Sequence, residues 1–363
     1  MRPLGYPEGS VEFLEEGENL ARDLGDRKAQ AYFQTNIGVY YLASGRDFVK
    51  GREYIERVLG ESELTEEVEI IVPTTYELIV SYSVEGAFSR SCQVAPKVIA
   101  LMEQTHTEHK RFDRPANIYS ILHGFYGKCL AATGNFTEGE RFLDKGLSFS
   151  RDIDNPMSIA MIEMLYGMFY LFKGDAENQV KHYSSSIDYL EKSQMSFFLG
   201  VVWTWLGGAY LYSGQTDTAL RYAQKGLEMH TDLGLPLFLG SIHWVLSEIH
   251  LAFGNLEKAL VHAEQAVDLS EKNIGINLGR IIAATDRKKS DEAREQMLLG
   301  VNMLDELQIR PRYAVGLMYL GEIYADAGQK EEALENLKKA EGMFQEMEMD
   351  YWLGKTQEVL AAL

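Results

Sequence analysis

Apolar residues recur at spacings of three and four along most of this 363-residue chain, and short polar turns interrupt the runs. Between Met161 and Met343 the apolar positions follow i, i+3, i+4 and i+7 on both sides of each turn. That spacing gathers apolar side chains on one face of a helix. The pattern therefore predicts an all-α chain built from pairs of amphipathic helices.

Glycines mark the turns and show that the helix pairs repeat. The turn glycines are Gly45, Gly134, Gly174, Gly214, Gly254 and Gly328, and those from 134 to 254 are 40 residues apart. Gly86 marks a weaker copy, and the 74-residue step from Gly254 to Gly328 spans about two units. Self-similarity at a period of 20 to 50 residues is typical of a solenoid, which grows by adding units.

The clearest copy of the repeat runs from Trp203 to Leu227. Its first helix carries Gly207 and its second helix carries Ala219, and we expect the two axes to cross closely there because both residues are small. Gly214 supplies the left-handed residue that ends the first helix. We expect Gly226 to leave room for the first helix of the next repeat.

The residue offsets of these copies resemble the tetratricopeptide repeat over nearly the whole chain. The final full copy has Leu317, Leu320, Gly321, Tyr324, Gly328, Ala333, Leu337 and Ala340 at the same offsets. The resemblance implies an α-α superhelix, a right-handed solenoid of antiparallel helix pairs. The usual repeat has 34 residues, so a period of about 40 makes each helix longer by most of a turn.

We expect a single solenoid domain over residues 1–363. Residues 1–30 are interpreted as the second helix of a truncated repeat, 31–275 as repeats, 276–309 as a distorted repeat, 313–347 as the last full repeat and 350–363 as a C-terminal helix. Ser10, Leu14 and Gly17 reproduce the offsets of a second helix. The chain is therefore interpreted as a fragment of a longer polypeptide, or as the product of a gene that lost its amino-terminal part.

The stretch from Ile309 to Leu360 is similar to the carboxy-terminal end of bacterial proteins with a class III adenylate or guanylate cyclase domain, a STAND-type ATPase domain and a repeat tail. In that family a glycine usually stands at the position of Glu348. The resemblance implies the regulatory tail of a signalling protein. This chain has no phosphate-binding loop of the form G-x-x-x-x-G-K-[ST] and no paired metal-binding aspartates. We therefore predict that it is not an enzyme and needs no cofactor.

Composition and charge narrow the function classes further. The chain has 35 basic and 54 acidic residues, a net charge of −19, and no basic cluster with interleaved aromatic residues. Such a field repels phosphate backbones, so we exclude nucleic acid as a partner. Two cysteines, Cys92 and Cys129, favour a reducing compartment. Without a signal peptide or an 18-residue apolar stretch, we expect no membrane span and a cytoplasmic location.

The concave face of such a solenoid is lined by first-helix residues, and here the lining is apolar with many methionines. The candidate groove residues are Tyr32, Tyr76, Lys128, Met161, Met164, Met168, Thr204, Trp244, Glu248, Met318 and Glu322. Methionine adapts to irregular partners, so this groove could accept an amphipathic helix or an apolar peptide. The same spacing is more often typical of residues that pack against neighbouring repeats.

Other candidate chemistry is sparse. His106 and His109 are separated by three positions, but nothing nearby completes a four-ligand zinc site, so we predict no metal. Glu163, Glu248 and Glu322 are expected on the inner face, without a nucleophile at a fixed distance.

Two function classes remain open. We favour a non-catalytic protein-interaction module whose partner is a protein or peptide, or an ATPase or cyclase domain of the same polypeptide. The alternative is a receptor that binds a peptide or small molecule directly in the groove. A closed pocket of a few hundred cubic ångströms between the inner helices would indicate the receptor, and an open trough would indicate a protein partner.

Overall fold

The computed structural model describes residues 9–43, 47–63, 67–234, 237–269, 275–285 and 290–363. Within these ranges the chain is 84% helical and contains no strand. The all-α fold and the superhelix of paired helices are thereby confirmed. Gly45 and the polar residues 286–289 lie outside the described ranges.

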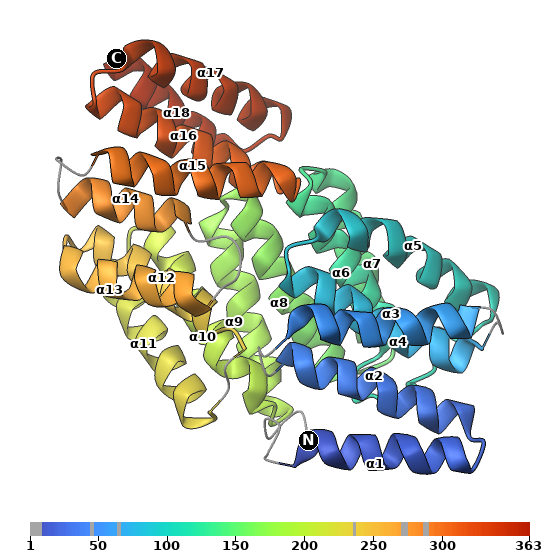
Figure 1. Ribbon diagram of the computed structural model, residues 1–363. Coiled ribbons are helices and arrows are strands. Elements are labelled where there is room, and N and C mark those ends of the chain that lie inside the picture. Colours follow the sequence, from blue (N-terminus) through green and yellow to red (C-terminus); the bar gives the residue numbers. More distant parts are fainter. Residues whose placement is uncertain (1–8, 44–46, 64–66, 235–236, 270–274, 286–289) are drawn as a thin grey trace.

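Eighteen helices follow one another along the described part of the chain (Figure 1). Their bounds are α1 (Ser10–Asp23), α2 (Arg27–Ala43), α3 (Phe48–Glu63), α4 (Val68–Val84), α5 (Phe88–Gln104), α6 (Ile118–Ala132), α7 (Phe136–Asp152), α8 (Pro156–Lys173), α9 (Ala176–Lys192), α10 (Ser196–Tyr212), α11 (Thr216–Asp232), α12 (Leu239–Ala252), α13 (Leu256–Leu269), α14 (Gly275–Thr285), α15 (Ser290–Glu306), α16 (Arg310–Asp326), α17 (Lys330–Glu346) and α18 (Asp350–Ala362). From α2 to α17 each even-numbered helix is the first of a pair and packs against the odd-numbered helix that follows it.

Small residues hold the two helices of a pair together. A Cβ on Gly207 would lie 2.7 Å from the carbonyl oxygen of Ala219, which confirms the close crossing predicted there. The prediction for Gly226 is wrong. A Cβ at this position would lie 2.2 Å from Thr204 Oγ1 and 2.3 Å from the carbonyl oxygen of Gly200, so Gly226 makes room for the first helix of its own repeat.

The 40-residue period comes from helices of 17 residues joined by short turns, each of which contains a left-handed residue. The turn after the first helix uses glycine, for example Gly174 with φ 82°. The turn after the second helix uses a residue that varies, such as Gln194 with φ 54°, Glu348 with φ 54° and, after α11, Gly234 with φ 62°. The backbone N–H of Met349 donates to the carbonyl oxygen of Phe344 at 3.0 Å, so the helix still stops beside Glu348.

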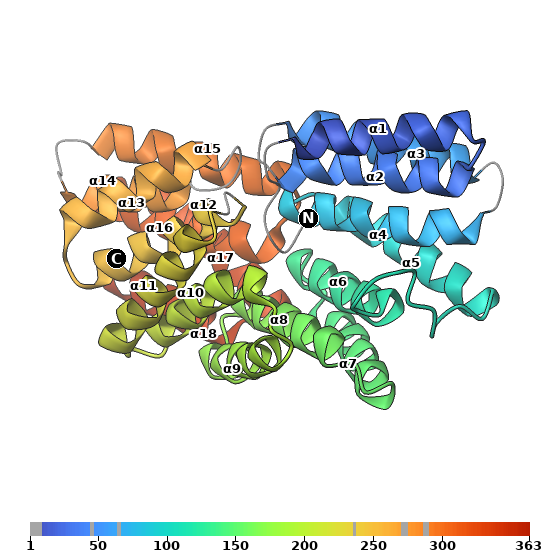
Figure 2. The same ribbon diagram turned by 90° about the horizontal axis from the view of Figure 1, so that it is seen from below.

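The superhelix closes on itself, because α16 packs against α6 and α8. One buried apolar cluster accordingly joins Phe125 and Leu165 of these middle helices to Met318 and Trp352 near the C-terminus. Helices α1–α5 lie on one side and α9–α14 on the other in both views, with α6–α8 between them (Figures 1 and 2). The chain's own C-terminal helices therefore cover the inner side of the middle repeats.

Because the superhelix closes, turn glycines that look alike in the sequence have different surroundings. Gly174 and Gly254 both have positive φ, 82° and 72°. A Cβ on Gly174 would lie 2.5 Å from Trp352 Nε1, whereas a Cβ on Gly254 would meet nothing within 4 Å. The turn after α8 is thus part of the interface with α18, and the turn after α12 is open.

We predict that Gly174→Ala destabilises the chain more than Gly254→Ala. Both substitutions force alanine into a left-handed conformation, which costs about 1–2 kcal/mol. Only Gly174→Ala also displaces Trp352, which adds roughly 1–3 kcal/mol. Urea unfolding followed by circular dichroism measures both values, and equal losses would contradict the packing of α18 on this turn.

Candidate functional site

Aromatic and charged side chains gather on the inner side of the C-terminal half of the superhelix. We name them the inner cluster: Tyr183 of α9, Tyr212 of α10, Trp244 and Glu248 of α12, Arg280 of α14, and Arg312, Tyr319 and Glu322 of α16. They belong to five consecutive repeats. The curvature of the superhelix therefore brings together residues that are up to 139 positions apart in the sequence.

One ion pair within the inner cluster is complete. Arg280 donates from Nη1 to Glu248 Oε1 at 2.6 Å and lies over the ring of Tyr319, 3.7 Å from its centroid. Burial opposes the charge of Arg280, but the Glu248 carboxylate outweighs it, so the pKa of the guanidinium is raised. Burial also raises the pKa of Glu322, and the positive charge of Arg280 offsets part of this rise.

Arg312 has no such partner. Its guanidinium lies over the indole of Trp244, 4.6 Å from the ring centroid. It makes no hydrogen bond or ion pair with any residue that the structure describes. An arginine stacked on an aromatic face keeps its five N–H donors available at the edge of its plane. Arg312 is therefore a free cation within a strongly acidic protein.

Tyr183 is the second unsatisfied group of the inner cluster. Its side chain is 1% exposed, and its hydroxyl has no hydrogen-bond partner in the structure. Burial raises the pKa of Tyr183, so the hydroxyl stays neutral and can donate. A buried hydroxyl without a partner is unfavourable, and such exceptions are uncommon in folded proteins.

The origin of this tyrosine is visible in the repeat pattern. Tyr183 occupies the second-helix position that Ala223 occupies forty residues later. Gly167 makes room for it, because a Cβ there would lie 2.2 Å from the tyrosine ring. At this junction α10 packs on α9 and makes few contacts with α8. Tyr183 thus reaches inward between two repeats.

A small cavity lies at this junction. It is lined by Leu171, Tyr183, Trp205, Gly208, Leu211, Tyr212, Trp244, Val245 and Glu248. Its volume of about 10 Å³ holds one water molecule. This is far below the few hundred cubic ångströms that would indicate a small-molecule receptor. An open trough is not present at the middle repeats either, because α16 covers them.

The groove residues predicted from the sequence do not all lie at one site. Trp244, Glu248 and Glu322 belong to the inner cluster. Met161, Met164, Met318, Lys128 and Thr204 are at most 6% exposed, Met168 and Tyr76 are half-buried, and Tyr32 is 57% exposed. Most of the methionine lining is therefore core, the alternative that the helical spacing also allowed.

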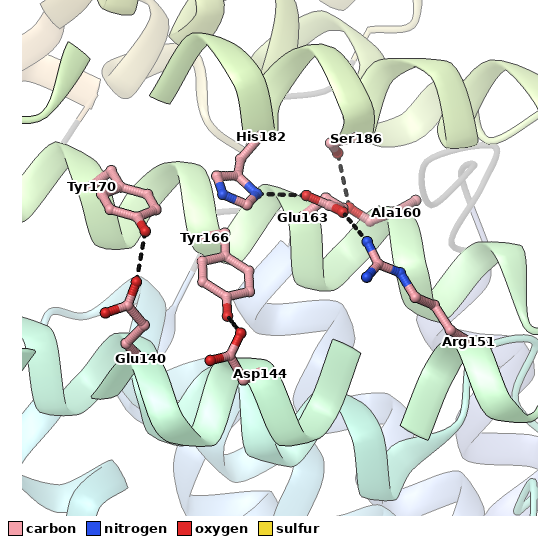
Figure 3. A network of polar contacts seen from close by, with 9 residues as sticks. All are labelled: Glu140, Asp144, Arg151, Ala160, Glu163, Tyr166, Tyr170, His182 and Ser186. Atoms are coloured by element: carbon pink, nitrogen blue, oxygen red, sulfur yellow. Dashed lines mark hydrogen bonds and ion pairs between the residues drawn. The ribbon is translucent and has the colours of Figure 1, made fainter. Parts of the chain in front are cut away.

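Thr204 and Glu163 were predicted to lie on the inner face, and the structure corrects both placements. Thr204 lies beside Gly226 of α11, so it faces the second helix of its own repeat. Glu163 accepts from Arg151 Nη2 at 3.4 Å and lies 2.6 Å from His182 Nδ1 (Figure 3). It therefore joins α8 to the outer helices α7 and α9.

Lys128 is a buried ammonium without a carboxylate. It donates to Ser83 Oγ and lies 4.9 Å and 5.4 Å from the ring centroids of Phe88 and Phe125. Burial lowers its pKa to about 8. With 1% of its surface exposed, it is enclosed by α4, α5 and α6 and does not reach the inner cluster.

Neither cysteine lies in surroundings that favour a thiolate. Burial raises the pKa of the Cys92 thiol to about 12 and raises that of Cys129, so neither is a reactive thiolate. No group of three or more His, Cys, Asp or Glu in the described ranges could hold a metal ion. Of the helices described, none is long and apolar enough to cross a membrane.

Comparison with known proteins agrees with this geometry. The family model described as tetratricopeptide repeat matches residues 240–265. A Rap protein solved in complex with competence and sporulation factor superposes with a TM-score of 0.58 at 18% identity, over 80% of each chain. This chain has the tetratricopeptide-repeat fold.

Further solved structures share the fold. Aspartyl phosphate phosphatase F from Bacillus subtilis superposes with a TM-score of 0.52 at 10% identity, over 93% of this chain and 95% of that one. A chain of the APC/C hetero-tetramer Cut9–Hcn1 gives a TM-score of 0.55 at 13% identity, over 94% of this chain and 59% of that one. No curated protein sequence matches the chain significantly. At these identities the tetratricopeptide-repeat fold alone is shared.

A histidine stack between α12 and α13 makes stability depend on pH. His243 Nδ1 and His262 Nδ1 are 2.9 Å apart, and the rings of His250 and His262 stack at 5.4 Å. Burial, followed by the two neighbouring histidines and Lys258, lowers the pKa of His262 to about 4. The folded chain therefore keeps His262 neutral down to about pH 4, whereas the unfolded chain protonates this histidine near pH 6.5.

We predict that the contribution of neutral His262 to the free energy of unfolding is complete above about pH 6.5, falls as the pH is lowered, and is lost below about pH 4. The loss attributable to His262 is about 2 kcal/mol after allowance for its partial exposure. His262→Gln should flatten the profile of unfolding free energy against pH. His109→Gln changes an exposed histidine and serves as the control, and equal profiles for the two variants would contradict the prediction.

Proposed function

We propose that this chain is a non-catalytic regulatory module that binds a protein or peptide segment at its inner cluster. The proposal rests on two observations around the indole of Trp244. The Arg312 guanidinium stacks on it and has no ion-pair partner among the described residues, and Tyr183, whose buried hydroxyl has no described hydrogen-bond partner, lines one cavity with Trp244. Aromatic and arginine side chains are the residues that dominate binding energy in protein interfaces. A binding partner would satisfy both polar groups.

The closure of the superhelix limits where a partner binds. Since α16 occupies the inner side of α6 and α8, the middle repeats are already covered. We therefore assign the partner segment to the inner cluster beside α10, α12 and α16 rather than to the middle repeats. The Rap protein with the same fold was solved in complex with competence and sporulation factor, which supports binding of this kind by a related superhelix. The cavity volume of about 10 Å³ favours a protein segment over a small-molecule receptor.

We also propose a wider context, on the resemblance of residues 309–360 to cyclase–ATPase signalling proteins. In this proposal the chain is the carboxy-terminal sensory or scaffolding part of a cytoplasmic multidomain protein, and its partner is the ATPase domain of the same polypeptide. The genomic reading frame upstream of Met1 tests this. An ATPase and a cyclase encoded in frame would support the proposal, and a stop codon directly before Met1 would contradict it.

We predict that Trp244→Ala lowers recovery of bound partners about thirtyfold when the tagged chain is used as bait in a lysate of its source cell. A tryptophan at the centre of an interface typically contributes 2 kcal/mol or more. Trp203→Ala is the matched control, because Trp203 stacks on Tyr222 and Lys225 of α11, away from the inner cluster. Equal recovery with the two variants would rule out binding at Trp244.

The absence of catalysis is tested separately. We expect no hydrolysis or cyclisation of ATP or GTP by the purified chain, because the described residues assemble neither a nucleophile nor a metal site. Measurable turnover that a point mutation in this chain abolishes would overturn the non-catalytic part of the proposal.

A further inference from the structure

One position of the second helix carries an aromatic ring in several repeats, and that ring packs on the first helix of its own repeat. The residues at this position are Tyr54 of α3, Phe142 of α7, His182 of α9, Tyr222 of α11 and His262 of α13. Each of them contacts an aromatic ring of the preceding helix, with centroid distances from 4.5 Å to 6.3 Å. This ring contact is therefore a recurring way in which a first helix and a second helix bind each other.

Helix α1 carries the same ring without a first helix packed on it. Leu14 of α1 aligns with Ala223 of α11, so Phe13 aligns with Tyr222. Among the described helices none precedes α1. Tyr222 is accordingly half-buried against α10, whereas Phe13 is 58% exposed. The surface that binds a first helix in the other repeats is open on α1.

Two leucines extend this open surface along α1. Leu20 and Leu24 are 61% and 73% exposed, whereas the residues that align with them after α11 has begun, Met229 and Leu233, are half-buried. Spacings of seven and four place Phe13, Leu20 and Leu24 on one side of a helix. We name these three residues the α1 face. Helix α1 lies at the edge of the molecule in both views (Figures 1 and 2), so a partner can approach it.

Acidic side chains border the α1 face along one side. Glu12, Glu16 and Asp23 are exposed, and 3.6 residues per turn place them together on that side. Arg221 and Lys225 stand at the positions of Glu12 and Glu16 on α11, so the charge at these two positions is reversed. A helix that packs on the α1 face therefore meets carboxylates, which favour lysine or arginine on its facing side. A second copy of α1 would instead bring like charges together.

From this arrangement we propose that the α1 face binds a basic amphipathic helix of a partner protein, which packs there as a first helix does in the other repeats. The partner helix presents an aromatic ring to Phe13 and lysine or arginine to the acidic border. It has a small residue where it crosses Leu14, as Gly127 has its close contact with Leu143 in the pair of α6 and α7. This surface is separate from the inner cluster, so the inference goes beyond the proposed function.

Fluorescence anisotropy with labelled synthetic peptides tests the proposal on the full chain. The basic peptide spans about five helical turns and copies the spacing of Trp203, Gly207 and Tyr210 in α10, with alanine in place of the glycine and lysines along one side of the rings. The acidic peptide has glutamate in place of each lysine, and the scrambled peptide has the composition of the basic one without its spacing. We expect wild type to bind the basic peptide about tenfold more tightly than either of the others.

Two pairs of variants assign the binding to residues. Phe13→Ala should weaken binding of the basic peptide about tenfold, because the buried ring is lost. Phe253→Ala is its control, since Phe253 is also an exposed phenylalanine, at 42%, but follows α12. Glu16→Lys should weaken binding of the basic peptide about threefold and strengthen binding of the acidic peptide about threefold. Glu228→Lys, at an exposed carboxylate of α11, changes the net charge equally and should alter neither affinity.

The outcomes separate this inference from the proposed function. Equal losses in Phe13→Ala and Phe253→Ala, or equal changes in Glu16→Lys and Glu228→Lys, would overturn binding at the α1 face. Binding that Trp244→Ala abolishes and Phe13→Ala leaves intact would place the peptide at the inner cluster and overturn the inference. A dimer of the wild-type chain in sedimentation that Phe13→Ala dissociates would assign the face to a second copy, which also contradicts it. If wild type binds none of the peptides, the inference fails, and the pull-down with Trp244→Ala still decides the proposed function.

Discussion

The rest of the structure depends on the close contact between the two helix backbones of each pair. A Cβ on Gly127 would lie 2.4 Å from the carbonyl oxygen of Gly139, and one on Gly38 would lie 2.7 Å from that of Gly51. At such distances the helix axes approach to the short end of the range for packed helices. Small residues at these positions let each pair form a unit with two faces, and the units stack into the superhelix.

The inner cluster lies beside a repeat whose second helix has large residues in place of small ones. At α8 and α9 the second-helix alanines are replaced by Gln179 and Tyr183, both 1% exposed. Gly167 compensates for the larger ring, and the first helix of the following repeat, α10, packs on α9 with few contacts to α8. The network of Glu163 and His182 in Figure 3 stabilises the outer side of the same repeat. The cavity lined by Tyr183 and Trp244 lies beside this repeat.

The sequence was sufficient to predict the fold because the period and the turn glycines are local signals. It was less informative about the second turn of each repeat, where Gln194 and Glu348 adopt the left-handed conformation without a glycine to mark them. The contact of Trp352 with Gly174 is equally invisible in the sequence, because it joins residues 178 positions apart. Helical spacing also cannot distinguish a groove residue from a core residue, so Met164 and Trp244 were predicted alike although only Trp244 belongs to the inner cluster. Arg312 and Tyr183 were missed because their significance lies in a partner that each lacks.

A crystal structure of the chain with a captured partner segment bound would test most directly whether the inner cluster is a binding site. The account predicts that the segment lies against Trp244 and Arg312. A segment bound along the outer helices α7 and α9, with the cavity at Tyr183 unchanged, would contradict it.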